Sequence, residues 1–217
     1  LEHNLWIMSD EVWCDIVFDD KTFLPTASLS QEIAERTFTV KGFSKNYGLA
    51  GLRIGALICP SPEIAESVAK SSKMTTTMSG ASTLSQIAAV AALSDSSQEY
   101  LRDWVLHLQD IRDAATKMIK EHSYGLATCL APEATYVLWI NISSTGFCSE
   151  EIAKRLLEKY KVAVVPGIEA IFGPGARGHI RLSMGTSKSI FMEGVRRLCC
   201  CLKDVAATKR ALSLIHI

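Results

Sequence analysis

The chain carries the segment GFSKNYGLAGLRIG at positions 42–55. Within it, Lys45 follows a small hydroxyl residue, Ser44, and Arg53 lies further on between two glycines, Gly51 and Gly55. A lysine amine can form an imine with an aldehyde, and a hydroxyl together with a guanidinium can hold a phosphate. The segment therefore predicts a site for a ligand that carries both an aldehyde and a phosphate.

Pyridoxal 5′-phosphate carries both groups, and the segment resembles the lysine signature of the class I and II aminotransferases, which are fold-type I pyridoxal-phosphate enzymes. Every position of that pattern around Lys45 is met, and the resemblance extends over residues 1–198. It implies that Lys45 forms the Schiff base and, once substrate displaces it, moves a proton at the substrate's α-carbon. It also implies that Ser44 and Arg53 hold the phosphate.

Two further side chains follow from the same resemblance. Ser9-Asp10-Glu11 resembles the family's aspartate motif, so Asp10 is expected to pair with the pyridine nitrogen and keep it protonated. Glu11 and Asp15 are the alternative carboxylates. The segment HIRLS at 179–183 resembles the family's C-terminal strand, so Arg181 is expected to bind the substrate's α-carboxylate with its fork-shaped guanidinium.

Trp13 departs from the family pattern. The family usually has tyrosine at this distance after the aspartate, where its hydroxyl contacts the cofactor's phenolic oxygen. An indole offers only an N–H donor and is bulkier. Trp13 is therefore either a cofactor-binding residue or a packed strand residue, and both interpretations stay open.

The resemblance also implies that part of the pocket comes from elsewhere. In the family, the group that stacks on the cofactor ring belongs to the N-terminal part, and a partner subunit completes the phosphate site. We expect the chain to be the C-terminal fragment of a homodimeric enzyme, and to be catalytically incomplete by itself.

Composition sets limits on other classes of function. Lys+Arg and Asp+Glu both number 23, so no basic face predicts nucleic acid as a partner. No apolar run reaches the roughly 18 residues of a membrane span. The seven cysteines form no C-x-x-C pair and the histidines show no ligand spacing, so we expect no metal site. An odd number of cysteines is typical of free thiols in a reducing compartment, and we expect a cytoplasmic protein.

Hydrophobic periodicity predicts an α/β fold. Strands are expected at 5–8, 37–40, 54–59, 137–142, 162–165 and 179–183. Helices are expected from Ser61, over 83–93 and 97–122, from an N-cap at Ser149, and over 191–202.

With the resemblance, this pattern predicts three regions. Residues 1–95 are expected to form the C-terminal part of the large cofactor domain, with a mixed, mostly parallel sheet and helices. Residues 96–205 are expected to form a connecting helix and a small α/β C-terminal domain, and 206–217 an unstructured or artefactual tail.

The function predicted first is that of an aminotransferase, which moves an amino group between an amino acid and a 2-oxo acid. One alternative on the same fold is a C–S lyase of the cystathionine β-lyase-like type, where residues other than tyrosine occur at the position of Trp13. The other is a catalytically incomplete fragment.

Overall fold

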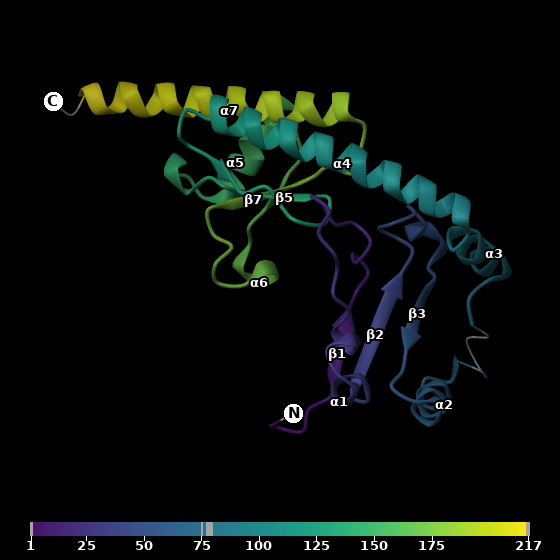
Figure 1. The fold of residues 1–217 in the computed structure, drawn as a ribbon. Coiled ribbons are helices and arrows are strands. Elements are labelled where there is room, and N and C mark those ends of the chain that lie inside the picture. Colours follow the sequence, from purple (N-terminus) through teal and green to yellow (C-terminus); the bar gives the residue numbers. More distant parts are fainter. Residues whose placement is uncertain (1, 75, 77–79, 216–217) are drawn as a thin grey trace. The chain divides into compact units, whose positions relative to one another are not determined.

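The computed structural model describes residues 2–74, 76 and 80–215. They divide into two units, Leu1–Val105 and Leu106–Ile217, each with its own sheet (Figure 1). The division falls inside the long helix α4 (Asp95–His122), whereas a boundary at its start was expected. The first turns of α4 belong to the first unit because they contact it: the side-chain amide of Gln98 donates to the Tyr47 hydroxyl at 3.1 Å.

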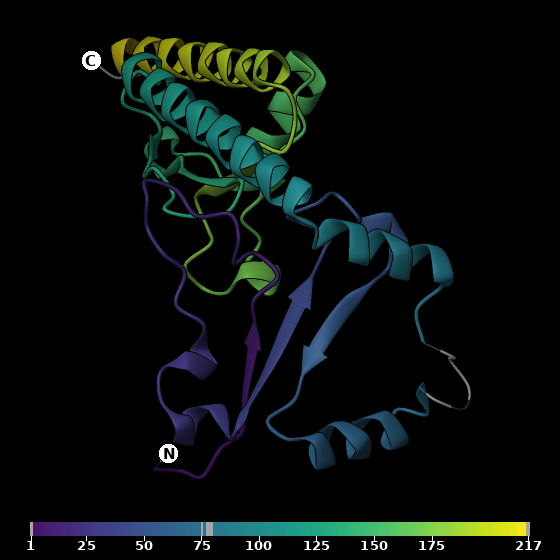
Figure 2. The same ribbon diagram turned by 45° about the vertical axis from the view of Figure 1, so that its right-hand side comes forward.

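The sheet of the first unit is mixed, in the order β1-β2-β3. Its strands are β1 (Ile7–Asp10), β2 (Thr37–Gly42) and β3 (Gly55–Ile58). Strand β2 pairs in parallel with β1 and antiparallel with β3, and Figure 2 shows it between them. The ends of β1 and β2 and the beginning of β3 therefore share one edge of the sheet.

Close backbone approach at this edge requires glycine. A Cβ on Gly55 would lie 2.8 Å from the carbonyl oxygen of Lys41, which belongs to the paired strand. A Cβ on Gly42 would lie 3.1 Å from Cγ1 of Val12. At position 55 only a residue without a side chain lets the two strands approach so closely, whereas a side chain at position 42 would require Val12 to shift by a few tenths of an ångström.

Serine hydroxyls begin three helices of this unit, at Ser30, Ser61 and Ser82. The Ser61 hydroxyl accepts from the backbone of Ile64 at 3.3 Å, and Pro62 takes the first helical position, which confirms the predicted start. The helical segments are η1 (Thr26–Ser28), α1 (Gln31–Ala34), η2 (Ala50–Leu52), α2 (Pro62–Ser71) and α3 (Thr83–Ala92).

The sheet of the second unit is antiparallel, in the order β4-β5-β7-β6. Its strands are β4 (Thr128–Cys129), β5 (Val137–Asn141), β6 (Val165–Pro166) and β7 (His179–Ser183). Its helical segments after α4 are η4 (Ser143–Thr145), α5 (Ser149–Arg155), the π-turn η5 (Leu156–Tyr160), α6 (Glu169–Phe172) and α7 (Lys188–Ile215). The predicted α/β class with a mixed sheet is confirmed, and no described helix is long and apolar enough to cross a membrane.

The core of the second unit lies between its sheet and two long helices. Figures 1 and 2 show the part of α4 after residue 106 lying beside α7. Apolar side chains from the sheet and from both helices are fully or almost fully buried, namely Leu108, Ile111, Ile119, Leu138, Ile140, Ile180, Val195, Leu198 and Leu202. The helical spacing and the strand alternation of the sequence thus converge on one core.

Replacing Ile140 with Ala should lower the free energy of unfolding by about 2–5 kcal/mol, because it leaves a cavity among fully buried side chains. Urea titration of both variants against the parent measures this. Ile171→Ala is the matched control, since that side chain is 65% exposed and should lose much less. Equal losses at both positions would show that Ile140 is not a core residue.

The local predictions for the tail and for the cap of α5 were wrong, and the strand expected at 162–165 is confirmed only at Val165, since β6 is Val165–Pro166. The tail expected from residue 206 continues as helix to Ile215, because the segment is rich in alanine, leucine, lysine and arginine, which favour helix; residues 216 and 217 lie outside the described residues. The N-cap of α5 is Cys148, whose backbone donates to the Glu151 carboxylate at 3.0 Å. Ser149 is buried instead, and its hydroxyl donates to the carbonyl of Gly167 at 3.2 Å.

Candidate active site

Three of the predicted site residues lie at the same edge of the first sheet. Asp10 is the last residue of β1, Lys45 follows the end of β2, and Arg53 precedes β3. Because β2 is parallel to β1 and antiparallel to β3, these three chain segments meet there. Ends of strands in open α/β sheets are where ligands gather.

A tight turn presents Lys45. The carbonyl oxygen of Phe43 accepts from the backbone of Tyr47 at 3.3 Å and of Leu49 at 3.2 Å. Gly48 has a φ of +69°, in the left-handed region that favours glycine. The chain therefore reverses directly after Lys45, and Ser44 and Lys45 stay half-buried.

Trp13 lies beside Lys45. The lysine Nζ is 5.2 Å from the centre of the indole ring, a cation–π contact that is worth about 0.5–1 kcal/mol at exposed sites. The indole is therefore part of the surroundings of the amine. Trp13 therefore lies beside the candidate lysine whether it binds the cofactor or only packs.

Arg53 has an unusual backbone. Its φ of 49° is in the left-handed region, which is uncommon for a residue with a side chain, and it ends the short helix η2. The Ser85 hydroxyl holds the preceding residue by donating to the carbonyl of Leu52 at 2.7 Å. The guanidinium is exposed and, within residues 2–74, 76 and 80–215, takes part in no ion pair. It is therefore available to an anion.

The three carboxylates near the end of β1 differ in their surroundings. Asp10 is exposed and accepts from the backbone of Val12 at 3.2 Å. Glu11 is buried and forms an ion pair with Lys41 at 3.1 Å. Asp15 accepts from the side-chain amide of Asn46. Of the three, Asp10 is the one without a cationic or side-chain amide partner among the described residues.

Lys41 differs from Lys45 in being engaged on two sides. Its Nζ lies 3.0 Å from Sγ of Cys14 and 3.1 Å from the Glu11 carboxylate. Burial acts to lower the pKa of Lys41, but the contacts with Cys14 and Glu11 outweigh it and raise the pKa. Lys41 is therefore a structural cation.

Arg181 belongs to the second unit, where aromatic rings surround it. It lies on β7 directly opposite Trp139 of β5, and its Cζ is 5.6 Å from the centre of the Phe172 ring. The Trp139 ring is 5.3 Å from Phe172 and stacks on His179 at 5.2 Å. The sequence did not single out Trp139 as a neighbour of Arg181, because alternation alone does not give the register between two strands.

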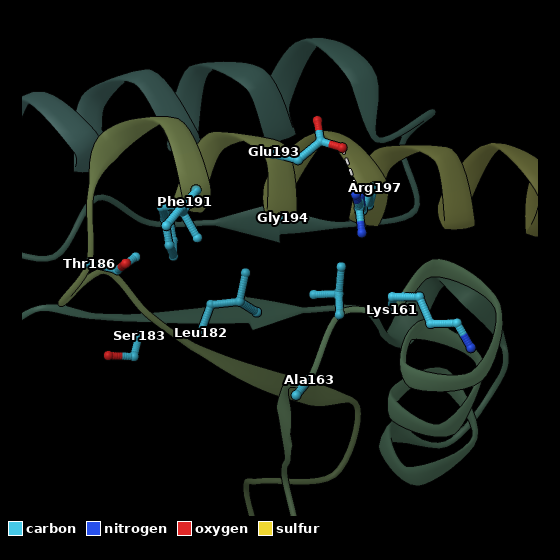
Figure 3. Close-up of a pocket in the computed structure, with 11 residues that line it drawn as sticks. Lys161, Ala163, Leu182, Ser183, Thr186, Phe191, Glu193, Gly194 and Arg197 are labelled. Atoms are coloured by element: carbon cyan, nitrogen blue, oxygen red, sulfur yellow. Dashed lines mark hydrogen bonds and ion pairs between the residues drawn. The ribbon is translucent and has the colours of Figure 1, made fainter.

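Another candidate site is a cavity of about 400 Å³ in the second unit (Figure 3). It opens beside the beginning of α7, where Leu182 and Phe191 form apolar walls and Arg197 points to Glu193. None of the predicted site residues lines it. Among the described residues, no group of three or more His, Cys, Asp or Glu side chains could hold a metal ion.

The pKa of Glu193 is expected to be about 2, because Arg196 and Arg197 both donate to its carboxylate. The pKa of the folded state is depressed, so the contribution of Glu193 to stability is present above about pH 4.5 and is lost as the pH falls towards 2. Carboxyl NMR titration measures this pKa. Arg196→Gln should raise it, and Arg177→Gln, which changes an arginine that pairs with Glu169, should not. An unchanged value in both variants would contradict the prediction.

Known proteins resemble this chain over most of its length. Residues 1–198 match the family model for aminotransferase class I and II. Aspartate aminotransferase from Pyrococcus abyssi is 33% identical over 202 residues, which are 91% of this chain and 49% of that protein. Cystathionine beta-lyase PatB from Bacillus subtilis is 28% identical over 198 residues, 91% of this chain and 50% of that protein.

A solved structure shows the same likeness. The crystal structure of aromatic aminotransferase from Pyrococcus horikoshii OT3 matches with a TM-score of 0.82 at 30% identity, over 94% of this chain and 52% of that one. The chain thus spans about half the length of the relatives it matches. Since the family model covers nearly all of the sequence, the chain belongs to the class I and II aminotransferase family.

Proposed function

We propose that the protein is a pyridoxal-phosphate-dependent aminotransferase, which moves an amino group between an amino acid and a 2-oxo acid. The observation that carries this proposal is the meeting of Asp10, Lys45 and Arg53 at one edge of the first sheet. Family membership supports it.

The residues present fit the cofactor chemically. Lys45 is a half-buried amine without a carboxylate partner among the described residues, and Arg53 is a cation available to a phosphate. Ser44 adds a hydroxyl donor next to the lysine. An amine for an aldehyde, two phosphate donors and a carboxylate for a ring nitrogen are the groups that pyridoxal phosphate needs from a protein.

Each residue would have one task. Pyridoxal phosphate, when bound, supplies an aldehyde carbon and an electron-withdrawing ring. Lys45 would hold the cofactor covalently and later move a proton at the substrate's α-carbon. Asp10 would hold a proton on the ring nitrogen. Arg53 and Ser44 would bind the phosphate, because charge-assisted hydrogen bonds from a guanidinium suit phosphate oxygens.

Arg181 would bind the substrate's α-carboxylate. A planar guanidinium can donate two parallel hydrogen bonds to a carboxylate, and the Phe172 ring restricts its orientation. Both the amino acid and the 2-oxo acid carry this carboxylate. One arginine therefore serves both halves of the proposed reaction.

The test is a spectrum of the purified protein with pyridoxal phosphate before and after borohydride treatment, followed by peptide mapping. We expect one equivalent of cofactor fixed to Lys45. A panel of amino acids with 2-oxo acid acceptors should then show amino transfer that requires the acceptor. A folded protein that binds no cofactor would refute the proposal.

A C–S lyase is the second candidate, favoured by Trp13 at the position where the family usually has tyrosine. The likeness to cystathionine beta-lyase PatB is also consistent with it. Release of pyruvate and ammonia from cystathionine without any oxo-acid acceptor would favour the lyase. An obligatory acceptor would favour the aminotransferase.

We further propose a homodimer located in the cytoplasm. A partner subunit would complete the phosphate site, as the family resemblance implies. All seven cysteines are free thiols, which supports a reducing compartment. Sedimentation of the holoenzyme at several concentrations measures the oligomeric state.

A further inference from the structure

Two polar contacts connect the segment after β1 to the segment that carries Lys45. Glu11 forms an ion pair with Lys41 at 3.1 Å, and the Asp15 carboxylate accepts from the side-chain amide of Asn46. Both contacts join residues 9–15 to residues 41–47. The two segments are therefore held together at two separate points.

The second contact involves a buried amide. Asn46 is 3% exposed, and its Oδ1 has no hydrogen-bond partner within the described part of the chain. A carboxylate can only accept hydrogen bonds, so the amide nitrogen must face Asp15. Because an unpaired buried amide is costly, the bond to Asp15 is what stabilises Asn46 in this place.

In sequence, the contact between Trp13 and Lys45 lies between the Glu11–Lys41 ion pair and the Asp15–Asn46 hydrogen bond. Trp13 is flanked in sequence by Glu11 and Asp15, and Lys45 directly precedes Asn46. The other side of the turn is held as well, since the Tyr47 hydroxyl accepts from Gln98 at 3.1 Å. Lys45 thus extends from a turn whose next two residues are both anchored.

From this geometry we infer that Asp15 is a positioning residue, which holds the Lys45 amine in place through its hydrogen bond to Asn46. The inference rests on the proposed function, because it concerns the lysine that would bind the cofactor. Asp15 itself is exposed and contacts Asn46 and the Cys14 thiol. Its effect on Lys45 passes through the backbone of the turn.

Asp15→Ala removes the carboxylate that accepts from the Asn46 amide and breaks this contact. A small misplacement of a reacting group can cost about 100-fold in rate. We expect pyridoxal phosphate to become fixed to Lys45 about 10- to 100-fold more slowly in borohydride trapping, and its dissociation constant to rise. Thermal denaturation of the apoprotein checks that the variant is folded.

A reciprocal exchange separates positioning from other roles of Asp15. In Asp15→Asn combined with Asn46→Asp, the new amide donates to the new carboxylate, so the hydrogen bond returns with its direction reversed. We expect part of the trapping rate to return, the rest being lost because the charge is now buried. If Asp15 acted directly on the cofactor ring, the exchange would not restore the rate.

Two more variants complete the test. Asn46→Ala removes the same contact without leaving a buried donor and should show the same defect, even if Asp15→Ala folds poorly. Asp113→Asn changes a carboxylate that pairs with Arg112 in α4 and should trap at the parental rate.

The outcomes are distinct. Equal trapping rates in the parent, Asp15→Ala and Asn46→Ala, or no recovery in the exchanged pair, would overturn the positioning role. A parent protein that is not labelled at all would instead refute the proposed function.

Discussion

Lys45→Ala should abolish the covalent labelling by borohydride and lower kcat for amino transfer by about 10² to 10⁴-fold, the range that a positioned acid–base group contributes. The effect is expected to be the largest in the chain, because the same amine would hold the cofactor and move the proton. Among the residues that the structure describes, no other lysine is half-buried in the turn after β2. Lys41, the nearest lysine in sequence, is engaged with Cys14 and Glu11.

The matched control is Lys70→Ala. Lys70 is exposed in the last turn of α2, so its loss should leave both labelling and kcat unchanged. Mass spectrometry of the digested protein shows which lysine carries the cofactor. Labelling that persists in Lys45→Ala, on another lysine and with substantial activity, would remove the assignment.

Arg181→Leu should raise KM for the amino acid and for the 2-oxo acid together, by about 10- to 150-fold. A hydrogen bond to a charged group contributes about 1.5–3 kcal/mol, and each 1.4 kcal/mol changes an equilibrium tenfold. Arg181→Lys should recover only part of the loss, because an ammonium cannot donate the two parallel bonds of a guanidinium. Steady-state kinetics with both substrates varied measure the effect.

Arg155→Leu serves as the control for this variant. Arg155 also lies over an aromatic ring of the second unit, with its Cζ 5.2 Å from the centre of Phe147. Losing that contact changes a cation–π pair without touching the proposed clamp, so KM should stay at the parental value. If both variants raise KM alike, the effect is structural and Arg181 is not the clamp.

The sequence predicted the elements whose signals are local. Ser61 and Pro62 predict the start of α2, and the apolar spacing after residue 97 predicts most of α4. Strand β7 begins and ends at the residues expected from alternation. The N-cap of α5 could not be predicted from the sequence. Ser149 is the usual type of N-cap residue, but its hydroxyl is buried against the carbonyl of Gly167, and Cys148 takes the N-cap position.

The residues of the candidate site near Lys45 could also be predicted from the sequence, since a lysine, a hydroxyl residue and an arginine are close in sequence there. The prediction for the tail was wrong, because composition favoured helix there and no local signal for a stop was present before residue 215. Phe172 and Trp139 beside Arg181 could not be assigned, because they come from different elements of the second unit.

By itself, then, the sequence determined the family pattern, the reactive residue types and the order of strands and helices, all of which depend on near neighbours in the chain. Only the tertiary structure decided which carboxylate is engaged and which is available: Glu11 with Lys41, Asp15 with Asn46, and Asp10 exposed at the sheet edge. The physical reason is register. Pairing of β1 with β2 brings residues about 30 positions apart into contact, and periodicity within either strand does not contain that alignment.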